Sequence, residues 1–181
     1  MSVGISEWML KTIREENNKI ALNSDWLEIE RFQWVSLVSR TITYILNGGT
    51  LLLCTDERFE WFGSYISSRI NRLKANRPLV PVFLLKDIIP NVYEHNNALV
   101  YDMLSLSYRD YAFWYIGKTS SAAAKLALSR NNGFLWIFDE SIQNALHLNS
   151  SDKMVDYKLI QLYKVFEEAL FGVMLGDIVL E

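Results

Sequence analysis

The stretch "NGGTLLLCTDERFEWF", residues 47–62, decides the expected fold of this chain. Asn47, Gly48 and Gly49 predict a helix end, because asparagine and glycine tolerate the left-handed backbone found there. The apolar run "TLLLCT" follows, and a short run bounded by turn residues predicts a strand covered on both faces. A helical pattern resumes at "ERFEWF". This order of helix, buried strand and helix predicts an α/β protein with a parallel sheet.

The turn after this strand lacks the features of a phosphate-binding loop. In nucleotide-binding α/β proteins that turn carries glycines, because the backbone must approach a phosphate closely. Here Asp56, Glu57, Arg58 and Phe59 supply charge and bulk instead. The sequence therefore predicts a sheet like that of nucleotide-binding proteins, but without a phosphate-binding loop after this strand.

The rest of the chain alternates apolar runs with amphipathic stretches. Pro81 lies in the second run and donates no backbone N–H, so we expect that strand near a sheet edge. Residues 96–108 fit a helix or a strand, and a helix is favoured because parallel strands need a crossover. Strands are predicted at 50–55, 79–85, 113–117 and 134–138, and helices at 5–21, 25–46, 58–74, 96–108, 122–130 and 152–176. The pattern predicts a doubly wound, mainly parallel sheet of four to five strands, with two added N-terminal helices and a long C-terminal helix.

Length and composition narrow the class of protein. At 181 residues and 21.0 kDa, the chain is expected to form a single domain, residues 1–181. The net charge is −3, and no run of Lys or Arg exceeds two residues, which argues against direct binding of nucleic acid. We expect no leader peptide, membrane span or internal disulfide, and hence a cytoplasmic protein. The 13% aromatic content exceeds what a small monomer usually hides, so an oligomer or a partner is expected.

The C-terminal stretch carries apolar residues on two faces of the predicted helix. Val155, Leu159 and Phe166 belong to one face, and Tyr163 and Leu170 belong to a second. A helix that is apolar on two faces needs two surfaces to pack against. We therefore expect this helix to form the core of an oligomer.

Several polar motifs could carry chemistry, and each has a structural alternative. The motif "GKTS" (117–120) ends like a phosphate-binding loop, but position 112 is alanine where that loop needs glycine. A strand-to-helix turn capped by Thr119 or Ser120 is favoured. Acidic residues follow the predicted strands and could bind Mg²⁺ or act as a general base, although acids also collect at helix starts because of the helix dipole. These residues are Asp56, Glu57, Asp87, Asp139 and Glu140.

No catalytic group, metal or cofactor is predicted. His95 and His147 are the only histidines, and they do not show the spacing of zinc ligands. Cys54 ends a buried strand and is expected to be a structural thiol.

The N-terminal region holds more large apolar residues than two helices can bury. Trp8, Trp26 and Trp34 occur with Ile29 and Phe32 among charged residues. Aromatic residues beside charges are typical of protein-binding hot spots and also of obligate interfaces. Composition leaves both interpretations open.

Six stretches occur in the order and spacing of a known family, namely "WLEIER" (26–31), "ILNGGTLLL" (45–53), "RPLVPV" (77–82), "FWYIGK" (113–118), "FLWIFDE" (134–140) and "DYKLIQLYKVFEEALF" (156–171). Along essentially its whole length the sequence resembles the HobA family, DnaA-binding initiation regulators of epsilon-proteobacteria. The resemblance implies an SIS- or flavodoxin-like three-layer sandwich, related in architecture to DiaA and assembled as a homotetramer of dimers. It also implies a non-enzymatic protein that binds the N-terminal domain of DnaA and promotes DnaA assembly at the replication origin.

The surplus aromatics and the "WLEIER" match place the expected DnaA-binding surface on the two N-terminal helices, at a dimer interface. The candidate residues are Trp8, Lys11, Glu15, Trp26, Leu27, Glu28 and Arg31. The alternative function is a phosphosugar-binding or isomerase-type SIS protein that uses Asp56, Glu57, Thr119 and Ser120. A third interpretation is a structural homo-oligomer whose tryptophans are all buried between subunits.

Overall fold

The structure is a computed structural model that describes residues 3–19, 25–72 and 77–180. Within these residues, five parallel strands form one sheet in the order β3-β2-β4-β5-β6. The strands are β2 (Thr50–Thr55), β3 (Val82–Leu84), β4 (Tyr111–Gly117), β5 (Phe134–Phe138) and β6 (Ala145–Leu148). Every residue of β2, β4 and β5 is buried, as expected for strands covered on both faces. β3 lies at an edge, which confirms the prediction made from Pro81.

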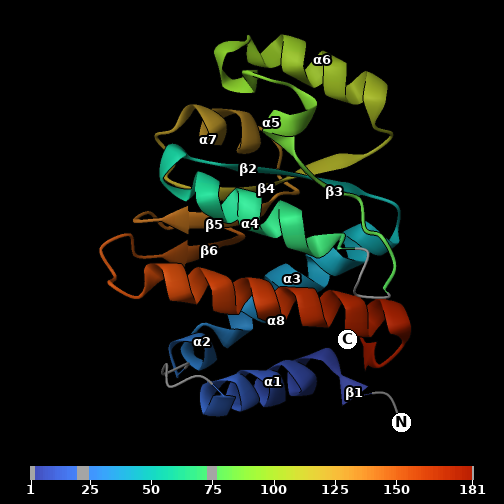
Figure 1. Ribbon diagram of the computed structural model, residues 1–181, viewed down its shortest axis with the longest axis vertical. Helices are drawn as coiled ribbons and strands as arrows, with labels where there is room; N and C mark the ends of the chain where they lie inside the picture. The colour runs from blue at the N-terminus through green and yellow to red at the C-terminus, as the bar shows by residue number, and fades with distance from the viewer. Residues whose placement is uncertain (1–2, 20–24, 73–76, 181) are drawn as a thin grey trace.

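Helices cover both faces of this sheet (Figure 1), which confirms the doubly wound α/β fold. One core lies against α3 (Arg31–Leu46), α4 (Glu60–Ile70) and α8 (Val155–Leu175). The other lies against α5 (Leu85–Ile88), α6 (Asn97–Ser107) and α7 (Ala122–Ala127). Short 3-10 helices, η1 (Glu57–Phe59) and η3 (Val92–Glu94), precede α4 and α6. The N-terminal helices α1 (Ile5–Lys19) and α2 (Asp25–Ile29) form an outer layer, in which α1 packs against α3 and α8.

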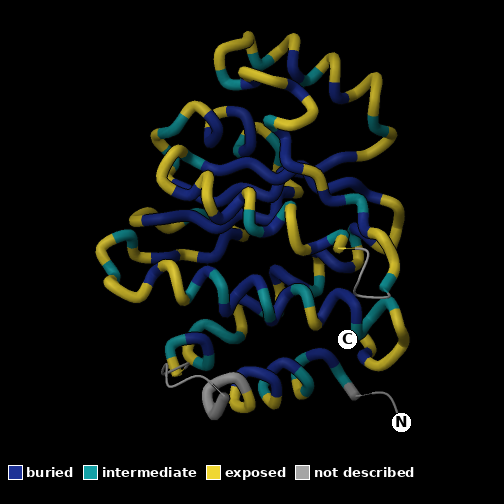
Figure 2. The backbone as a smooth tube through the Cα atoms, viewed as in Figure 1, coloured by how far each residue is buried: buried dark blue, intermediate teal, exposed yellow. Residues whose placement is uncertain are grey.

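An aromatic cluster fixes α3 and α8 on the same face of the sheet. Trp34 of α3 lies 5.6 Å, centroid to centroid, from Trp136 of β5. Phe166 of α8 lies 5.0 Å from Trp114 of β4 and 4.9 Å from Phe134 of β5. All five side chains are fully buried (Figure 2 shows the buried interior of the fold), and each buried ring contributes about 2–3 kcal/mol to stability.

Several predicted elements were wrong in their boundaries or were missed. The predicted helix 25–46 is interrupted, because the chain bends at Glu30 between α2 and α3. β6 was not predicted, since its four residues include the exposed His147 and form no continuous apolar run. A parallel pair of two-residue strands, β1 (Val3–Gly4) and β7 (Ile178–Val179), was also missed. The predicted ends of the helices at 20–21 and 73–74 lie outside the described residues.

The expectation that α8 forms an oligomer core was wrong for most of its length, because both of its apolar faces are covered within the chain. Phe166 faces the sheet, as described above. On the other side, the Tyr163 ring lies 5.6 Å from Tyr65 and 6.5 Å from Phe62 of α4. Large apolar side chains of α8 are exposed near its two ends, where Tyr157 is 53% and Leu175 is 62% exposed.

Candidate partner-binding site

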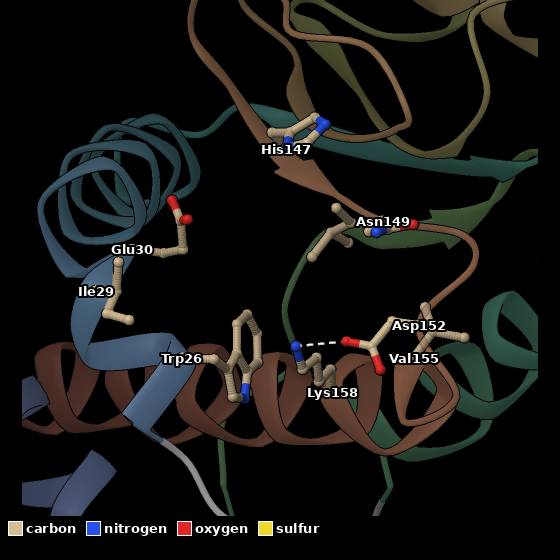
Figure 3. A pocket seen from close by; sticks show the side chains of 9 residues that line it. Trp26, Ile29, Glu30, His147, Asn149, Asp152, Val155 and Lys158 are labelled. Atoms are coloured by element: carbon tan, nitrogen blue, oxygen red, sulfur yellow. Dashed lines mark ion pairs between the residues drawn. The ribbon is translucent and has the colours of Figure 1, made fainter.

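A hollow of about 200 Å³ lies beside Trp26, where α2 meets the end of β6 and the start of α8 (Figure 3). We call it the Trp26 pocket. Its walls come from two segments that are far apart in sequence, residues 26–30 and residues 147–158. They include Trp26 and Ile29 of α2, His147 of β6, Asp152 of the following loop, and Val155 and Lys158 of α8. The pocket therefore exists only because the fold brings the N-terminal layer onto the edge of the sheet.

The side chain of Trp26 is held in place by two contacts from α8. Its Nε1 donates a hydrogen bond to Gln161 Oε1 at 3.3 Å. Lys158 Nζ lies 4.6 Å from the centre of the indole ring, in a cation–π contact. The same Nζ lies 2.6 Å from Asp152 Oδ2, and this interaction lowers the pKa of the Asp152 carboxyl. A side chain fixed in this way loses little conformational entropy when a partner binds.

Two large apolar side chains are exposed where α2 is followed by α3, one in the wall of this pocket and the other on α3. Ile29 is 78% exposed and Phe32 is 77% exposed. The guanidinium of Arg31 lies 4.7 Å from the centre of the Phe32 ring. Exposed apolar residues near a half-buried tryptophan and a charged rim are typical of a protein-binding surface.

The structure separates the seven residues predicted as a DnaA surface into exposed, half-buried and buried groups. Lys11 and Glu15 are exposed on α1, with 3.8 Å between Lys11 Nζ and Glu15 Oε1. Glu28 accepts a hydrogen bond from Arg14 Nε at 3.2 Å, which joins α2 to α1. Half-buried positions are occupied by Trp8, Trp26, Glu28 and Arg31.

Leu27 packs in the core and is not available to contact a partner, since it is 1% exposed. Ile29 would have been the better candidate, although spacing alone does not say which of the two residues is exposed. Residues 27 and 29 lie about 200° apart on a helix, so both cannot face the same core. Asp152, His147 and Lys158 had no signal at all, because nothing in the sequence joins them to α2.

A second hollow, of about 430 Å³, lies at the carboxyl ends of the strands, where the phosphosugar alternative places its ligand. Asp56, Glu57, Arg58, Glu60 and Ser121 contribute to its lining. Most of these charges are negative, which opposes the binding of a phosphate.

Two polar side chains of that second hollow, Asp56 and Ser121, already have hydrogen-bond partners within the chain. Asp56 accepts from the backbone N–H of Phe59 at 3.3 Å and of Lys118 at 2.9 Å. The Ser121 hydroxyl lies 2.7 Å from Tyr115 Oη and accepts from the N–H of Ala124. Ser121 is thereby the N-cap of α7, which corrects the expectation for Thr119 or Ser120.

A glycine is required where the "GKTS" motif begins. A Cβ on Gly117 would lie 2.7 Å from Asp56 Oδ2 and would also meet the Tyr115 hydroxyl. The absence of a side chain at Gly117 therefore makes room for the Asp56 carboxylate of the same chain.

The other sequence candidates form no common metal-binding cluster within the described residues. Asp87, His95 and Glu140 are exposed. Asp139 is paired with Lys118, at 2.6 Å between Oδ2 and Nζ. Cys54 is fully buried, and this burial raises the pKa of its thiol. The described residues contain no group of three His, Cys, Asp or Glu side chains placed to bind a metal ion, and none of their helices is long and apolar enough to cross a membrane.

The fold and this surface define a class: a doubly wound α/β protein that exposes apolar side chains on the helices outside its sheet. Comparison with known proteins then gives the family. The sequence model of HobA, described as a DNA replication regulator, matches residues 1–180. The DNA replication regulator protein HobA of Helicobacter pylori is 36% identical over 177 residues, which cover 96% of this chain and 97% of that protein. The chain therefore belongs to the HobA family of DNA replication regulators.

Two solved structures are similar along nearly the whole chain. One is the HobA chain in a complex of HobA with DnaA (domain I-II) from H. pylori, with a TM-score of 0.79 and 34% identity. The other is HobA from H. pylori, with a TM-score of 0.76 and 35% identity. Each match covers 96% of this chain and 97% of the other.

Proposed function

We propose that this chain is a non-enzymatic regulator that binds the N-terminal domain of DnaA and promotes DnaA assembly at the chromosomal replication origin. It acts in the cytoplasm as one folded domain, residues 1–181, and assembles into a homotetramer. Several equivalent binding sites on one assembly raise the effective concentration of DnaA beside its DNA sites, with no chemical step.

The match to the HobA chain of the HobA–DnaA (domain I-II) complex is the observation that supports this proposal most directly. At 34% identity over 96% of the chain, the two proteins share a fold and a family. The exposed side chain of Ile29, in the wall of the Trp26 pocket, gives this surface the apolar character that a protein partner requires. We place DnaA on this surface, with Trp26 and Ile29 at its centre and Lys11, Glu15 and Glu28 beside them.

The phosphosugar alternative is not supported by a comparable observation. The charged residues of the hollow at the strand ends are mostly acidic, and its Asp56 and Ser121 side chains are hydrogen-bonded within the chain. Thermal unfolding with and without sugar phosphates tests this alternative, and we expect the same midpoint in both.

Binding of DnaA can be tested by sedimentation velocity with domains I and II of DnaA from the same organism. We expect a saturable heavier complex, which the Ile29→Asp variant weakens roughly tenfold or more, because the new charge must be desolvated at the interface. Leu106→Asp is the matched control, since Leu106 is 90% exposed on α6, on the other face of the sheet (Figure 1). The absence of any complex with the unmodified protein would refute the function. Unchanged binding by Ile29→Asp would move the surface elsewhere.

A further inference from the structure

One carboxylate in the wall of the Trp26 pocket has no counter-ion among the described residues. Asp152 and Lys158 neutralise each other, because Lys158 Nζ lies 2.6 Å from Asp152 Oδ2. The other oxygen of Asp152, Oδ1, accepts from the backbone N–H of Met154 at 2.8 Å. Glu30, between α2 and α3, is half-buried and makes no ion pair or side-chain hydrogen bond with another described residue. The charge of Glu30 is therefore left over in this pocket.

Glu30 also lacks the structural role that a polar residue before a helix usually has. It is the N-cap of α3, yet its side chain makes no capping hydrogen bond. A capping side chain would accept from a backbone N–H in the first turn of the helix. The positive end of the α3 dipole nevertheless favours the ionised carboxylate at this position. The pocket thus contains a negative charge whose hydrogen-bonding capacity is unused within the described chain.

The other walls of the pocket combine apolar surface with polar groups (Figure 3). Ile29, Leu148 and Val155 contribute apolar side chains. His147, exposed on β6, has no hydrogen-bond partner among the described residues. A group that enters this pocket therefore meets apolar surface and, beside it, a carboxylate and an imidazole.

We propose that the Trp26 pocket binds one basic side chain of the protein partner, whose charged group pairs with Glu30. This inference rests on the proposed function and names the chemistry by which DnaA is held at this site. An acidic side chain would be repelled by Glu30. A purely apolar side chain would remove water from Glu30 and His147 without replacing its hydrogen bonds, which costs free energy.

Arginine suits this pocket better than lysine. Its aliphatic stem can pack along Ile29 and Val155 while the guanidinium stays at the polar wall. A guanidinium donates two parallel hydrogen bonds to one carboxylate and keeps further N–H groups for His147. It is also more weakly hydrated than an ammonium group, so its desolvation costs less. The volume of about 200 Å³ is below the usual range of about 300–1,000 Å³ for ligand pockets and suits a single side chain.

Glu30→Gln tests the charge of this residue while keeping its size. We expect this variant to bind domains I and II of DnaA roughly tenfold more weakly, since a charge-assisted hydrogen bond becomes a neutral one. Glu30→Lys should weaken binding roughly 100-fold, because like charges then meet in the pocket. Glu94→Gln and Glu94→Lys are the matched controls, since Glu94 is exposed on η3, which packs on the other face of the sheet. Isothermal titration calorimetry measures the affinities, and thermal unfolding confirms that the variants are folded. Unchanged affinity of the folded Glu30→Gln variant would overturn the proposal.

Salt dependence distinguishes the loss of an ion pair from a change of shape. Raising NaCl from about 50 mM to about 500 mM shortens the screening length and weakens ion pairs at the surface. We expect the affinity of the unmodified protein for DnaA to fall more steeply with salt than the affinity of Glu30→Gln. The same slope for both proteins would contradict an ion pair at Glu30.

A small probe tests the pocket without DnaA. N-acetylarginine amide carries the guanidinium, and N-acetylcitrulline amide has nearly the same shape without the charge. We expect only the arginine compound to shift the NMR resonance of the Trp26 Nε1–H in a saturable way, and Glu30→Gln to remove this shift. The resonance is assigned by its loss in Trp26→Phe.

The outcomes of these measurements separate the pocket from the proposed function. Equal shifts with the two compounds, or no shift with either, would overturn the basic-side-chain site even if DnaA binds. If the unmodified protein forms no complex with DnaA while the arginine compound still shifts Trp26, the proposed function fails and the site for a basic side chain stands.

Discussion

Asp139 joins three loops at the carboxyl ends of β4, β5 and β6. Its Oδ2 accepts from Lys118 Nζ and from Ser150 Oγ, each at 2.6 Å, and its Oδ1 accepts from the Ser150 N–H at 2.8 Å. The residue adopts a left-handed backbone, with φ of 65°, that aspartate tolerates better than most residues. The hydrogen bonds from Lys118 and then from Ser150 hold the pKa of this carboxyl far below its usual range.

We expect Asp139→Asn to lower the urea midpoint at neutral pH and to have less effect in acid. A carboxyl whose folded pKa is depressed stabilises the protein fully above its ordinary pKa of about 3.9 and loses that contribution as pH falls toward the folded pKa. Urea unfolding of the variant and the unmodified protein at about pH 7 and at about pH 3 measures this difference, because about pH 3 lies below the ordinary pKa of aspartate. The exposed Asp87→Asn serves as control. The same deficit for Asp139→Asn at both pH values would contradict this assignment.

At the scale of single elements, α8 is held mainly by its contact with the aromatic cluster. Replacing Phe166 with alanine removes a fully buried ring and leaves a cavity between α8 and the sheet. We expect Phe166→Ala to reduce the free energy of unfolding by about 3–5 kcal/mol. Leu175→Ala, on the same helix but 62% exposed, should cost much less. Chemical denaturation of the two variants decides, and comparable losses would contradict the packing described here.

Elements with a strong local pattern were those that could be predicted from the sequence. β2 and β5 are continuous apolar runs, and their bounds match the predicted strands. β6 is stabilised by pairing with β5 from Leu135 to Phe138. This pairing produces no recognisable pattern of apolar residues in a strand of only four residues. The bend at Glu30 was missed for a related reason. No helix-breaking residue marks it in the sequence, and α2 is instead tied to α8 by the hydrogen bond from Trp26 to Gln161.

At the scale of the whole molecule, the two ends of the described chain are joined. Val3 pairs with Ile178 and Gly4 with Val179 in the β1–β7 ladder, which ties the start of α1 to the end of α8. Ile178 is 3% exposed and fills the space that a Cβ on Gly172 would need. The position of the N-terminal layer therefore depends on residues at the far end of the sequence.

We expect Ile178→Ala to loosen α1 without unfolding the sheet. The lost packing should speed amide hydrogen exchange in α1 by about tenfold, while β2 and β4 keep their protection. Val179→Ala is the matched control, because Val179 is 46% exposed on the same short strand. Hydrogen exchange followed by mass spectrometry compares the variants. Unchanged exchange in α1 of Ile178→Ala would show that α3 and α8 alone hold this helix.

The sequence by itself determined the α/β class, the buried strands, the long C-terminal helix and the family, because these depend on local apolar patterns and on the order of motifs along the chain. Only the tertiary structure decided which of the apolar residues are free for a partner. Leu27 and Ile29 are near neighbours of similar chemistry, yet one is 1% and the other 78% exposed. The same holds for α8, whose second apolar face is covered by its own chain. Exposure depends on contacts between segments far apart in sequence, and local spacing carries no record of those contacts.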